Sequence, residues 1–218
     1  MSGLGQFYGS TVGKKVVMAI TGVVWIGYVV VHMSGNLLAW AGAAAINDWA
    51  AFLKSMPLLL WGTRGILLVS VVLHVSAAAS LRRLDRRSRP VGYDRYRYAE
   101  ASWPSRFMGW GGILLLVFLV YHILELTIGV IHPQFSHTDV YGNLVSYLRV
   151  WWIGGFYLVA MVALAGHLYH GAWSMFQTVG ANHPKYERLR RTAATLIAVV
   201  VPLGFATIPL AILFGWLR

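Results

Sequence analysis

The sequence contains no cysteine and few charged residues. Of its 218 residues, 11% are charged and only 7 are Asp or Glu. The absence of cysteine excludes a disulfide framework, thiolate-bound zinc, cysteine-ligated iron–sulfur clusters and a covalently attached c-type haem in this chain. Any metal or cofactor that the chain binds would therefore be held by histidine or methionine.

Apolar residues dominate the rest of the composition. They make up 58% of the chain, and the mean hydropathy is +0.62. This composition is typical of an integral membrane protein rather than a water-soluble domain. A helix needs roughly 20 apolar residues to cross about 30 Å of hydrocarbon. Runs of that length predict an all-α membrane protein, a single domain over residues 1–218, with transmembrane helices at about 15–40, 58–81, 106–131, 150–177 and 192–217.

The basic residues are distributed unevenly between the predicted connecting segments. Fourteen of the 18 lysines and arginines lie before the first span, in the segment 82–106 or in the segment before the fifth span. Because cytoplasmic loops carry an excess of Lys and Arg, we expect a cytoplasmic N-terminus and an external C-terminus. Topology and contact with anionic lipid account for the net charge of +11, so nucleic-acid binding is not expected.

Each of the first four predicted spans carries a histidine. These residues are His32, His74, His122 and His167. An ionisable side chain in hydrocarbon is costly and usually marks a function. One such residue on each of four helices predicts a shared buried object, and paired imidazoles are typical ligands of haem.

The predicted depths of these histidines arrange them as two pairs. With a helical rise of 1.5 Å per residue, His32 and His122 lie roughly 24–27 Å from the cytoplasmic ends of their helices. His74 and His167 lie roughly 12–15 Å from theirs. We therefore expect the first four helices to bind two stacked b haems, the outer one between His32 and His122 and the inner one between His74 and His167. His170 is an alternative ligand, because it lies three residues after His167 on nearly the same helix face.

The remaining polar residues near the predicted helix ends have less specific roles. His132, His137 and His183 fall in predicted loops, and we expect them to be solvated. Haem propionates need cationic or hydrogen-bonding partners. Arg64 is a candidate partner for the outer haem, with snorkelling to the interface as the alternative. Gln177 and Lys14 are candidates for the inner haem.

Several sequence segments resemble one known family. They are STVGKK at 10–15, MAITG at 18–22 with His32 ten residues later, HILELT at 122–127, and HLYHGAW at 167–173 leading to Phe176 and Gln177. This pattern is similar to the single-subunit, two-haem cytochrome b of bacterial succinate:quinone oxidoreductases, and the similarity covers essentially the whole chain. The resemblance implies that His32 and His122 hold the distal haem and that His74 and His167 hold the proximal one. It favours His167 over His170, because the fourth ligand in that family lies four residues before a glycine.

The resemblance also implies a location and partners. The chain would be the membrane anchor of a succinate dehydrogenase or fumarate reductase in the bacterial cytoplasmic membrane. A cytoplasmic flavoprotein carrying FAD and an iron–sulfur subunit would exchange electrons with quinone through this chain, which would do no chemistry on the dicarboxylate. The complex would be at least a heterotrimer, and the direction of the reaction is left open.

Glu125 is the only acidic residue well inside a predicted span. It follows His122 by three residues, on the same helix face and toward the outer surface. We expect it to relay protons to or from a quinone near the distal haem, with a structural helix-end carboxylate as the alternative. Asn47 and Asp48 are a second predicted proton route. Some relatives that couple haem transfer to proton movement carry a glutamate where this chain has Ala165. Without it, we expect electron transfer between the haems to be electrogenic. With a quinone at the outer site, the membrane potential would then help to drive succinate oxidation by a low-potential quinone such as menaquinone.

Two other functions are consistent with parts of the sequence. A di-haem cytochrome b anchor of a hydrogenase or formate dehydrogenase would have the same paired histidines but different partner subunits. A small proton-coupled transporter could use the histidines as a relay. The absence of an inverted repeat and the single carboxylate well inside the spans argue against the transporter.

Overall fold

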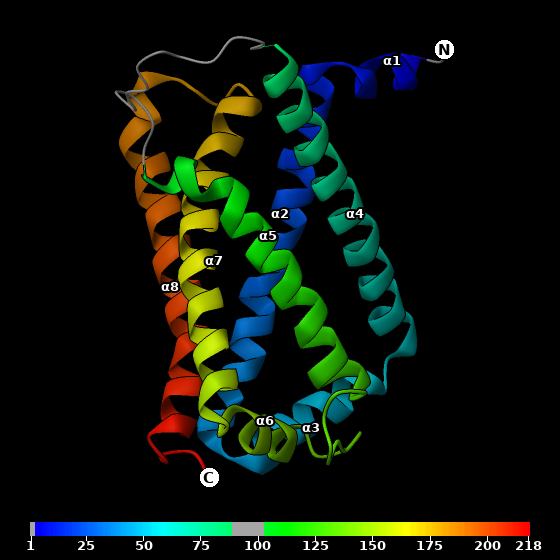
Figure 1. The fold of residues 1–218 in the computed structure, drawn as a ribbon, viewed down its shortest axis with the longest axis vertical. Helices are drawn as coiled ribbons and strands as arrows, with labels where there is room; N and C mark the ends of the chain where they lie inside the picture. Colours follow the sequence, from blue (N-terminus) through cyan, green and yellow to red (C-terminus); the bar gives the residue numbers. More distant parts are fainter. Residues whose placement is uncertain (1–2, 89–102) are drawn as a thin grey trace.

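The computed structural model describes residues 3–88 and 103–218, and within them it is helical. Five helices are long and apolar enough to cross a membrane, and they form one bundle (Figure 1). These candidate spans are Thr11–Ala41, Pro57–Arg87, Arg106–Ile128, Trp151–Thr178 and Pro184–Leu213. Over the described residues, the prediction of an all-α protein with five candidate transmembrane helices is therefore confirmed. Part of the arginine-rich segment 82–106 lies outside the described residues.

The first half of the chain forms two long helices with a short one between them. A short helix α1 precedes α2, which continues into the 3₁₀ turn η1, and α3 then leads to α4. The bounds are α1 Gly3–Gly9, α2 Thr11–Asn36, η1 Leu37–Ala41, α3 Ala43–Lys54 and α4 Pro57–Arg87. Ser10 begins α2 as an N-cap, because its hydroxyl accepts from the Gly13 N–H at 2.9 Å. Pro57 begins α4, where its missing N–H costs nothing.

The second half of the chain supplies the other three spans. The bounds are α5 Trp103–Ile123, the π-turn η2 Leu124–Ile128, α6 Val140–Leu148, α7 Trp151–Thr178, the 3₁₀ turn η3 Pro184–Tyr186 and α8 Glu187–Leu213. The short helices α3 and α6 lie across the end of the bundle opposite α1 (Figure 1). The sequence predicted only connecting segments in their place, because runs of 12 and 9 residues are too short to span a bilayer.

The spans pack unevenly against one another. Helix α7 packs along α8 and α5, and α2 packs along α4, with additional close contacts between α2 and both α7 and α8. A core of buried apolar side chains joins α6, α7 and α8 near the end capped by α3 and α6. Over the described residues, neither α2 and α5 nor α4 and α7 pack their backbones together to a comparable extent.

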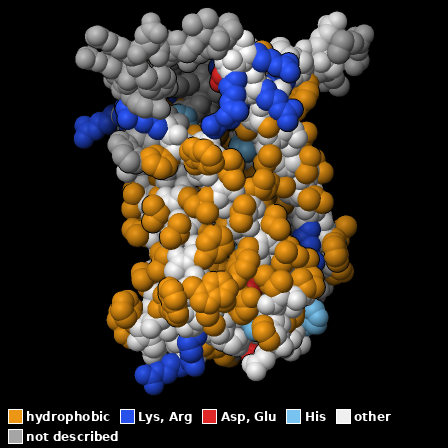
Figure 2. Space-filling view, viewed as in Figure 1, with side chains coloured by type: hydrophobic (Ala, Val, Ile, Leu, Met, Phe, Trp, Pro, Cys, Tyr) orange, Lys and Arg blue, Asp and Glu red, His pale blue; other side chains and the backbone are white. Residues whose placement is uncertain are grey.

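The outer surface of the bundle matches a lipid environment. Apolar side chains cover its middle, and the Lys and Arg side chains gather mainly toward the two ends (Figure 2). The exposed apolar residues include Leu58, Trp110 and Val162, which are 89%, 71% and 76% exposed. Side chains of this kind on a long helix are stable in contact with hydrocarbon rather than water.

Candidate functional site

The four span histidines meet in the two pairs that the sequence predicts. His32 on α2 and His122 on α5 have ring centres 5.9 Å apart. His74 on α4 and His167 on α7 have ring centres 6.2 Å apart. Each pair joins two helices that do not otherwise pack closely over the described residues. The histidine rings therefore bring α2 to α5 and α4 to α7 at positions where the helix backbones do not pack together.

The inner pair is oriented by a hydroxyl group on a third helix. Thr21 on α2 lies 3.0 Å from Nδ1 of His74. Its hydroxyl donates to the Val17 carbonyl at 2.7 Å, so its oxygen is left to accept the Nδ1–H of the imidazole. That hydrogen bond leaves the Nε2 lone pair of His74 free to bind a metal ion.

The outer pair has a corresponding hydroxyl on α7. The Tyr157 hydroxyl lies 3.1 Å from Nδ1 of His122 and donates to Oε2 of Glu125 at 2.7 Å. Its oxygen therefore accepts the Nδ1–H of His122, and the Nε2 lone pair of this ring is free as well. Tyr157 is 7% exposed and Glu125 is fully buried, so the chain from carboxyl to imidazole lies away from solvent.

The backbone of α5 changes its winding at Glu125. The α-helix ends at Ile123, and Leu124–Ile128 form one π-turn that stops at Gly129 in the left-handed conformation (φ 81°). Insertions of this kind in a helix occur frequently at functional sites. The turn contains Glu125, whose carboxyl reaches Tyr157 on α7. The Oε1 atom of Glu125 has no hydrogen-bond partner among the described residues.

The other two histidines of the pairs have weaker polar partners. The Asn36 amide lies 3.3–3.4 Å from both ring nitrogens of His32 and donates to the His32 carbonyl at 2.8 Å. Tyr28 stacks on the His32 ring with a centre distance of 5.4 Å. Nδ1 of His167 is buried without a partner among the described residues. It is the ring of His167 that faces His74, and His170 is half-buried.

The surroundings of the rings fit a flat cofactor bound by two imidazoles. Metal–imidazole bonds are about 2 Å long, so two imidazoles on opposite sides of one ion have ring centres on the order of 6 Å apart. A Cβ at Gly22 would come within 3.9 Å of the His74 ring, and one at Gly112 within 4.0 Å of the His167 ring. Helix backbone without side chains therefore lies beside the inner pair. Within residues 3–88 and 103–218, no three His, Asp or Glu side chains gather as a zinc site would require.

Of the predicted propionate partners, Arg64 and Gln177 lie at the surface and Lys14 is half-buried. Arg64 is exposed, and its guanidinium lies 4.8 Å from the centre of the Trp61 ring. This contact fits the snorkelling alternative, since it holds the charge beside an exposed aromatic side chain. The Lys14 ammonium group donates to the Gly9 carbonyl at 3.2 Å, and Gln177 is exposed. None of these contacts assigns a propionate partner.

Asn47 forms part of a clasp at the capped end of the bundle. Its side chain donates to Asp139 at 3.0 Å and accepts from the Tyr141 N–H at 3.0 Å, which ties α3 to the start of α6. Asp139 also caps α6 by accepting from the Gly142 N–H at 2.9 Å. This N–H, and after it the Asn47 amide, hold the pKa of Asp139 below its ordinary value. Asp48 is exposed, and no hydrogen bond joins Asn47 or Asp48 to Glu125 within the described residues.

One of the loop histidines is not solvated. His137 and His183 are exposed as predicted, but His132 is only 6% exposed. Its ring stacks on Tyr147 at 4.6 Å and lies 3.2 Å from the Asn143 carbonyl. The prediction of a solvated His132 is wrong, because the short helix α6 covers a segment that the sequence predicts to be an open loop.

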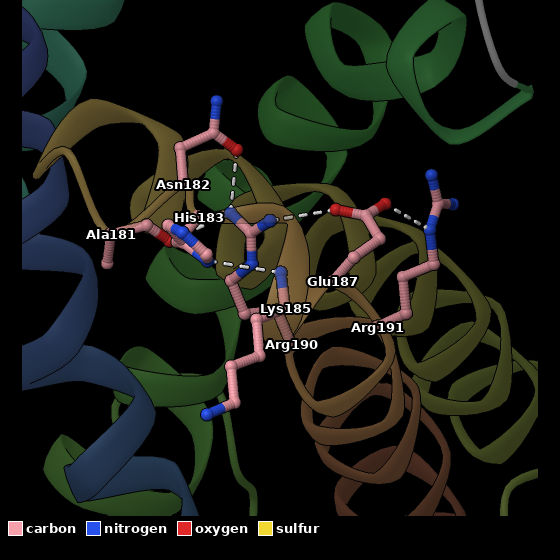
Figure 3. Close-up of polar contacts among 7 residues, drawn as sticks. All are labelled: Ala181, Asn182, His183, Lys185, Glu187, Arg190 and Arg191. Carbon is pink, nitrogen blue, oxygen red and sulfur yellow. Dashed lines mark hydrogen bonds and ion pairs between the residues drawn. The ribbon is translucent and has the colours of Figure 1, made fainter.

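A second polar network lies at the opposite end, where α7 turns into α8 (Figure 3). Arg190 is 4% exposed and donates to the Ala181 carbonyl at 2.8 Å and to Asn182 at 2.7 Å. It also pairs with Glu187 at 2.8 Å, and the same carboxylate binds Arg191 at 2.7 Å. Arg190 is therefore a buried residue that stabilises this turn, as well as one of the basic residues of the predicted cytoplasmic side.

Sequence reasoning missed the residues that orient the histidines. Thr21, Asn36 and Tyr157 were not predicted as site residues. The signal that could have found them is a hydroxyl or amide group inside or at the end of a predicted span, since such groups need a hydrogen-bonding partner in hydrocarbon. Sequence alone does not tell which helix faces another, so it could not assign these partners.

The fold and the paired histidines define a multi-pass helical membrane protein with a candidate cofactor site inside its bundle. Residues 85–207 match the family model described as the succinate dehydrogenase/fumarate reductase transmembrane subunit. The chain belongs to this family, and it is thus a membrane subunit of an enzyme complex rather than the part that acts on the dicarboxylate.

A curated relative extends the similarity over nearly the whole chain. The succinate dehydrogenase cytochrome b558 subunit of Bacillus subtilis (strain 168) is 25% identical over 202 residues. The match covers 92% of this chain and 93% of that protein. No solved structure matches the chain.

Proposed function

We propose that this chain is the quinone-reactive cytochrome b anchor of a succinate:quinone oxidoreductase and that it binds two b haems. His32 and His122 would hold the distal haem, and His74 and His167 the proximal haem. The observation that carries the proposal is the meeting of four half-buried imidazoles in two pairs, at two levels of one bundle. The family membership and the name of the Bacillus subtilis relative support the same assignment.

The hydrogen bonds of the ligands support binding through Nε2. Thr21 and Tyr157 each accept from Nδ1 of one histidine, which selects the tautomer that a metal ion needs. Two imidazoles per iron leave no open coordination position, so the groups held there would supply one-electron transfer rather than oxygen binding. The task of the protein residues is then to orient the rings and to exclude water.

The partners and the location follow from the family. We propose that an iron–sulfur subunit and a flavoprotein with FAD dock in the cytoplasm, on the end of the bundle that holds α1 and the α7–α8 turn. The complex would lie in the bacterial cytoplasmic membrane. The bias of Lys and Arg to the end that holds α1 and the α7–α8 turn supports this orientation.

A quinone site near the distal pair is the finer part of the proposal. Glu125 lies at the outer level, is fully buried and keeps one carboxyl oxygen without a partner among the described residues. A carboxyl in that state is suited to take up or release a proton when a quinone beside it is reduced or oxidised. Asn47 is occupied by the clasp to α6, so it supports the fold there rather than a proton route. Menaquinone remains the proposed quinone.

A haem count on ligand variants tests the proposal. The purified complex is analysed by a pyridine haemochrome assay and a reduced-minus-oxidised spectrum. We expect two b haems per chain, loss of one in His32→Ala or His122→Ala, and loss of the other in His74→Ala or His167→Ala. His183→Ala is the control, because that side chain is exposed in the α7–α8 turn, and His170→Ala should also keep both haems.

The outcomes separate the proposal from its alternatives. A folded complex without haem would leave a bare membrane anchor as the function. Loss of haem in His170→Ala but not in His167→Ala would move the fourth ligand by one helix turn. Loss of both haems from every single variant would show that the two pairs do not bind independently.

A further inference from the structure

Tyr157 is the buried side chain that joins two groups of the outer site. Its hydroxyl lies between Nδ1 of His122, at 3.1 Å, and the carboxyl of Glu125, at 2.7 Å. A hydroxyl has one hydrogen, and here that hydrogen is directed to the carboxyl. The oxygen of Tyr157 is consequently an acceptor for the imidazole, and the three groups form one directed chain of hydrogen bonds.

The inner site contains a similar hydroxyl with a weaker acceptor behind it. Thr21 also accepts from a ligand imidazole, but its own hydrogen goes to the neutral Val17 carbonyl. Hydrogen bonds polarise one another along a chain, and those that end on an ionised carboxylate, as Glu125 supplies when deprotonated, are stronger than those that end on a neutral carbonyl. The Tyr157 oxygen should therefore pull harder on the Nδ1–H of His122 than Thr21 pulls on that of His74.

The hydrogen bonds from His122 through Tyr157 to Glu125 lie in apolar surroundings, so water does not screen them. Glu125 is fully buried and Tyr157 is 7% exposed, and Phe118 packs against both the His122 ring and the Tyr157 ring at 5.7 and 4.9 Å. The π-turn at Leu124–Ile128 carries Glu125, whose carboxyl bonds to Tyr157 across the α5–α7 contact. In such an apolar setting a hydrogen bond is electrostatically stronger than it would be in water.

We propose that Tyr157 is a positioning residue that makes His122 a more electron-donating ligand than His74, by linking its Nδ1–H to the carboxyl of Glu125. The proposal rests on the proposed function, in which these histidines bind haem iron. A partner that accepts from the outer nitrogen of a metal-bound imidazole raises the basicity of that ligand. A more basic ligand stabilises the oxidised iron. The hydrogen bonds from His122 through Tyr157 to Glu125 would therefore lower the midpoint potential of the haem that His122 holds, compared with a haem whose histidine donates to a neutral acceptor.

A potentiometric titration of the two haems in the purified complex tests this role. Tyr157→Phe removes the hydroxyl and keeps the ring, and we expect an upward shift of the midpoint potential of the distal haem alone. Glu125→Gln keeps an acceptor for the tyrosine hydroxyl but removes the carboxylate, and we expect a smaller shift in the same direction. Thr21→Val is the matched control at the inner pair, and it should move the proximal haem and leave the distal one unchanged.

Each result has a defined meaning. Distal potentials equal to the wild type in both Tyr157→Phe and Glu125→Gln, with two haems bound, would overturn the proposed role of Tyr157 and leave the haem assignment intact. Equal shifts of both haems in Tyr157→Phe would also overturn it, because they would indicate a general change in packing. Absence of haem from the wild-type complex would instead overturn the proposed function. The haem that His122→Ala eliminates identifies which titration wave is the distal one.

Discussion

Single residues in this chain act largely by satisfying buried polar groups. Thr21 and Tyr157 each use one hydroxyl both to donate to a nearby oxygen and to accept from an imidazole. Arg190 satisfies the carbonyl and amide oxygens of the α7–α8 turn. Such pairing stabilises a polar group that loses water on burial, since an unpaired one costs about 1–3 kcal/mol.

Glu125 gives the first prediction at this scale. Glu125→Gln should lower the rate of quinone reduction by succinate more than the rate with a soluble dye that accepts electrons before the membrane subunit. The reason is that the amide cannot exchange a proton with quinone. The ratio of the two rates, measured on the same preparation, is the readout. An unchanged ratio would leave Glu125 with a role in the hydrogen-bonded chain only.

Asp139 gives a prediction about stability. Asp139→Ala removes the N-cap of α6 and the link to Asn47, and loss of such a cap costs about 1 kcal/mol. Hydrogen exchange at the first amides of α6 should become faster, while amides in the middle of α7 keep their protection. Equal exchange rates at the first amides of α6 in the variant and the wild type would show that the contacts of Asp139 with Asn47 and Gly142 do not stabilise α6.

The same clasp should depend on pH. The folded-state pKa of Asp139 is lowered, so its contribution to stability is present above the unfolded-state value of about 3.9 and is lost as the pH falls through the folded-state value. Exchange at the start of α6, corrected for intrinsic rates, should therefore accelerate on acidification below about pH 4. Asp139→Asn is the control, because its side chain does not titrate and its exchange should show no such step.

Among the helical elements, the long spans were predictable and the short helices were not. Apolar runs and their flanking basic residues predicted all five spans. Helix α4 extends to Arg87, six residues past the end predicted at residue 81. Helices α3 and α6 and the π-turn depend on contacts between distant parts of the chain, such as the bond from Asn47 to Asp139. No local sequence pattern encodes those contacts, so sequence alone gave loops there.

The start of α7 allows a prediction about helix packing. A Cβ at Gly154 would lie 2.8 Å from the Leu148 carbonyl and 3.0 Å from the Leu213 side chain on α8. Gly154→Ala should therefore destabilise the α6–α7 turn by about 1–3 kcal/mol, which thermal unfolding in detergent would detect. Gly27→Ala is the control, since Gly27 is exposed with no atom within 4 Å of the added carbon, and it should be neutral or slightly stabilising. Equal unfolding temperatures for the two variants would contradict the close approach.

For the whole molecule, the sequence predicted which histidines meet but not what surrounds them. Depth along each helix depends on sequence position alone, so it correctly grouped His32 with His122 and His74 with His167. The third partners of the rings depend on how the helices are rotated and packed, which hydropathy does not encode. Tyr157 was therefore missed even though it lies in a recognised span.

The orientation in the membrane can be tested directly because the chain has no cysteine. Ser55→Cys and Lys185→Cys each place one thiol at an exposed position, at opposite ends of the bundle. A maleimide that does not cross membranes should label Ser55→Cys in intact cells (spheroplasts, if there is an outer membrane) and Lys185→Cys only after lysis. The reverse pattern would place the N-terminus outside. The wild-type chain serves as the unlabelled control.

Each histidine pair joins one helix from the first half of the chain with one from the second half, α2 with α5 and α4 with α7. With haem bound as proposed, neither site can be completed on the ribosome before α5 and α7 have been made. Helix α4 contacts mainly α2 and α3 until then. Chains without haem would lack the links from α2 to α5 and from α4 to α7, and their two halves would be held together by the contacts of α2 with α7 and α8 and by the bond from Asn47 to Asp139. Because haem would bind the folded bundle, chains that lack it should also be less stable than chains that hold both haems.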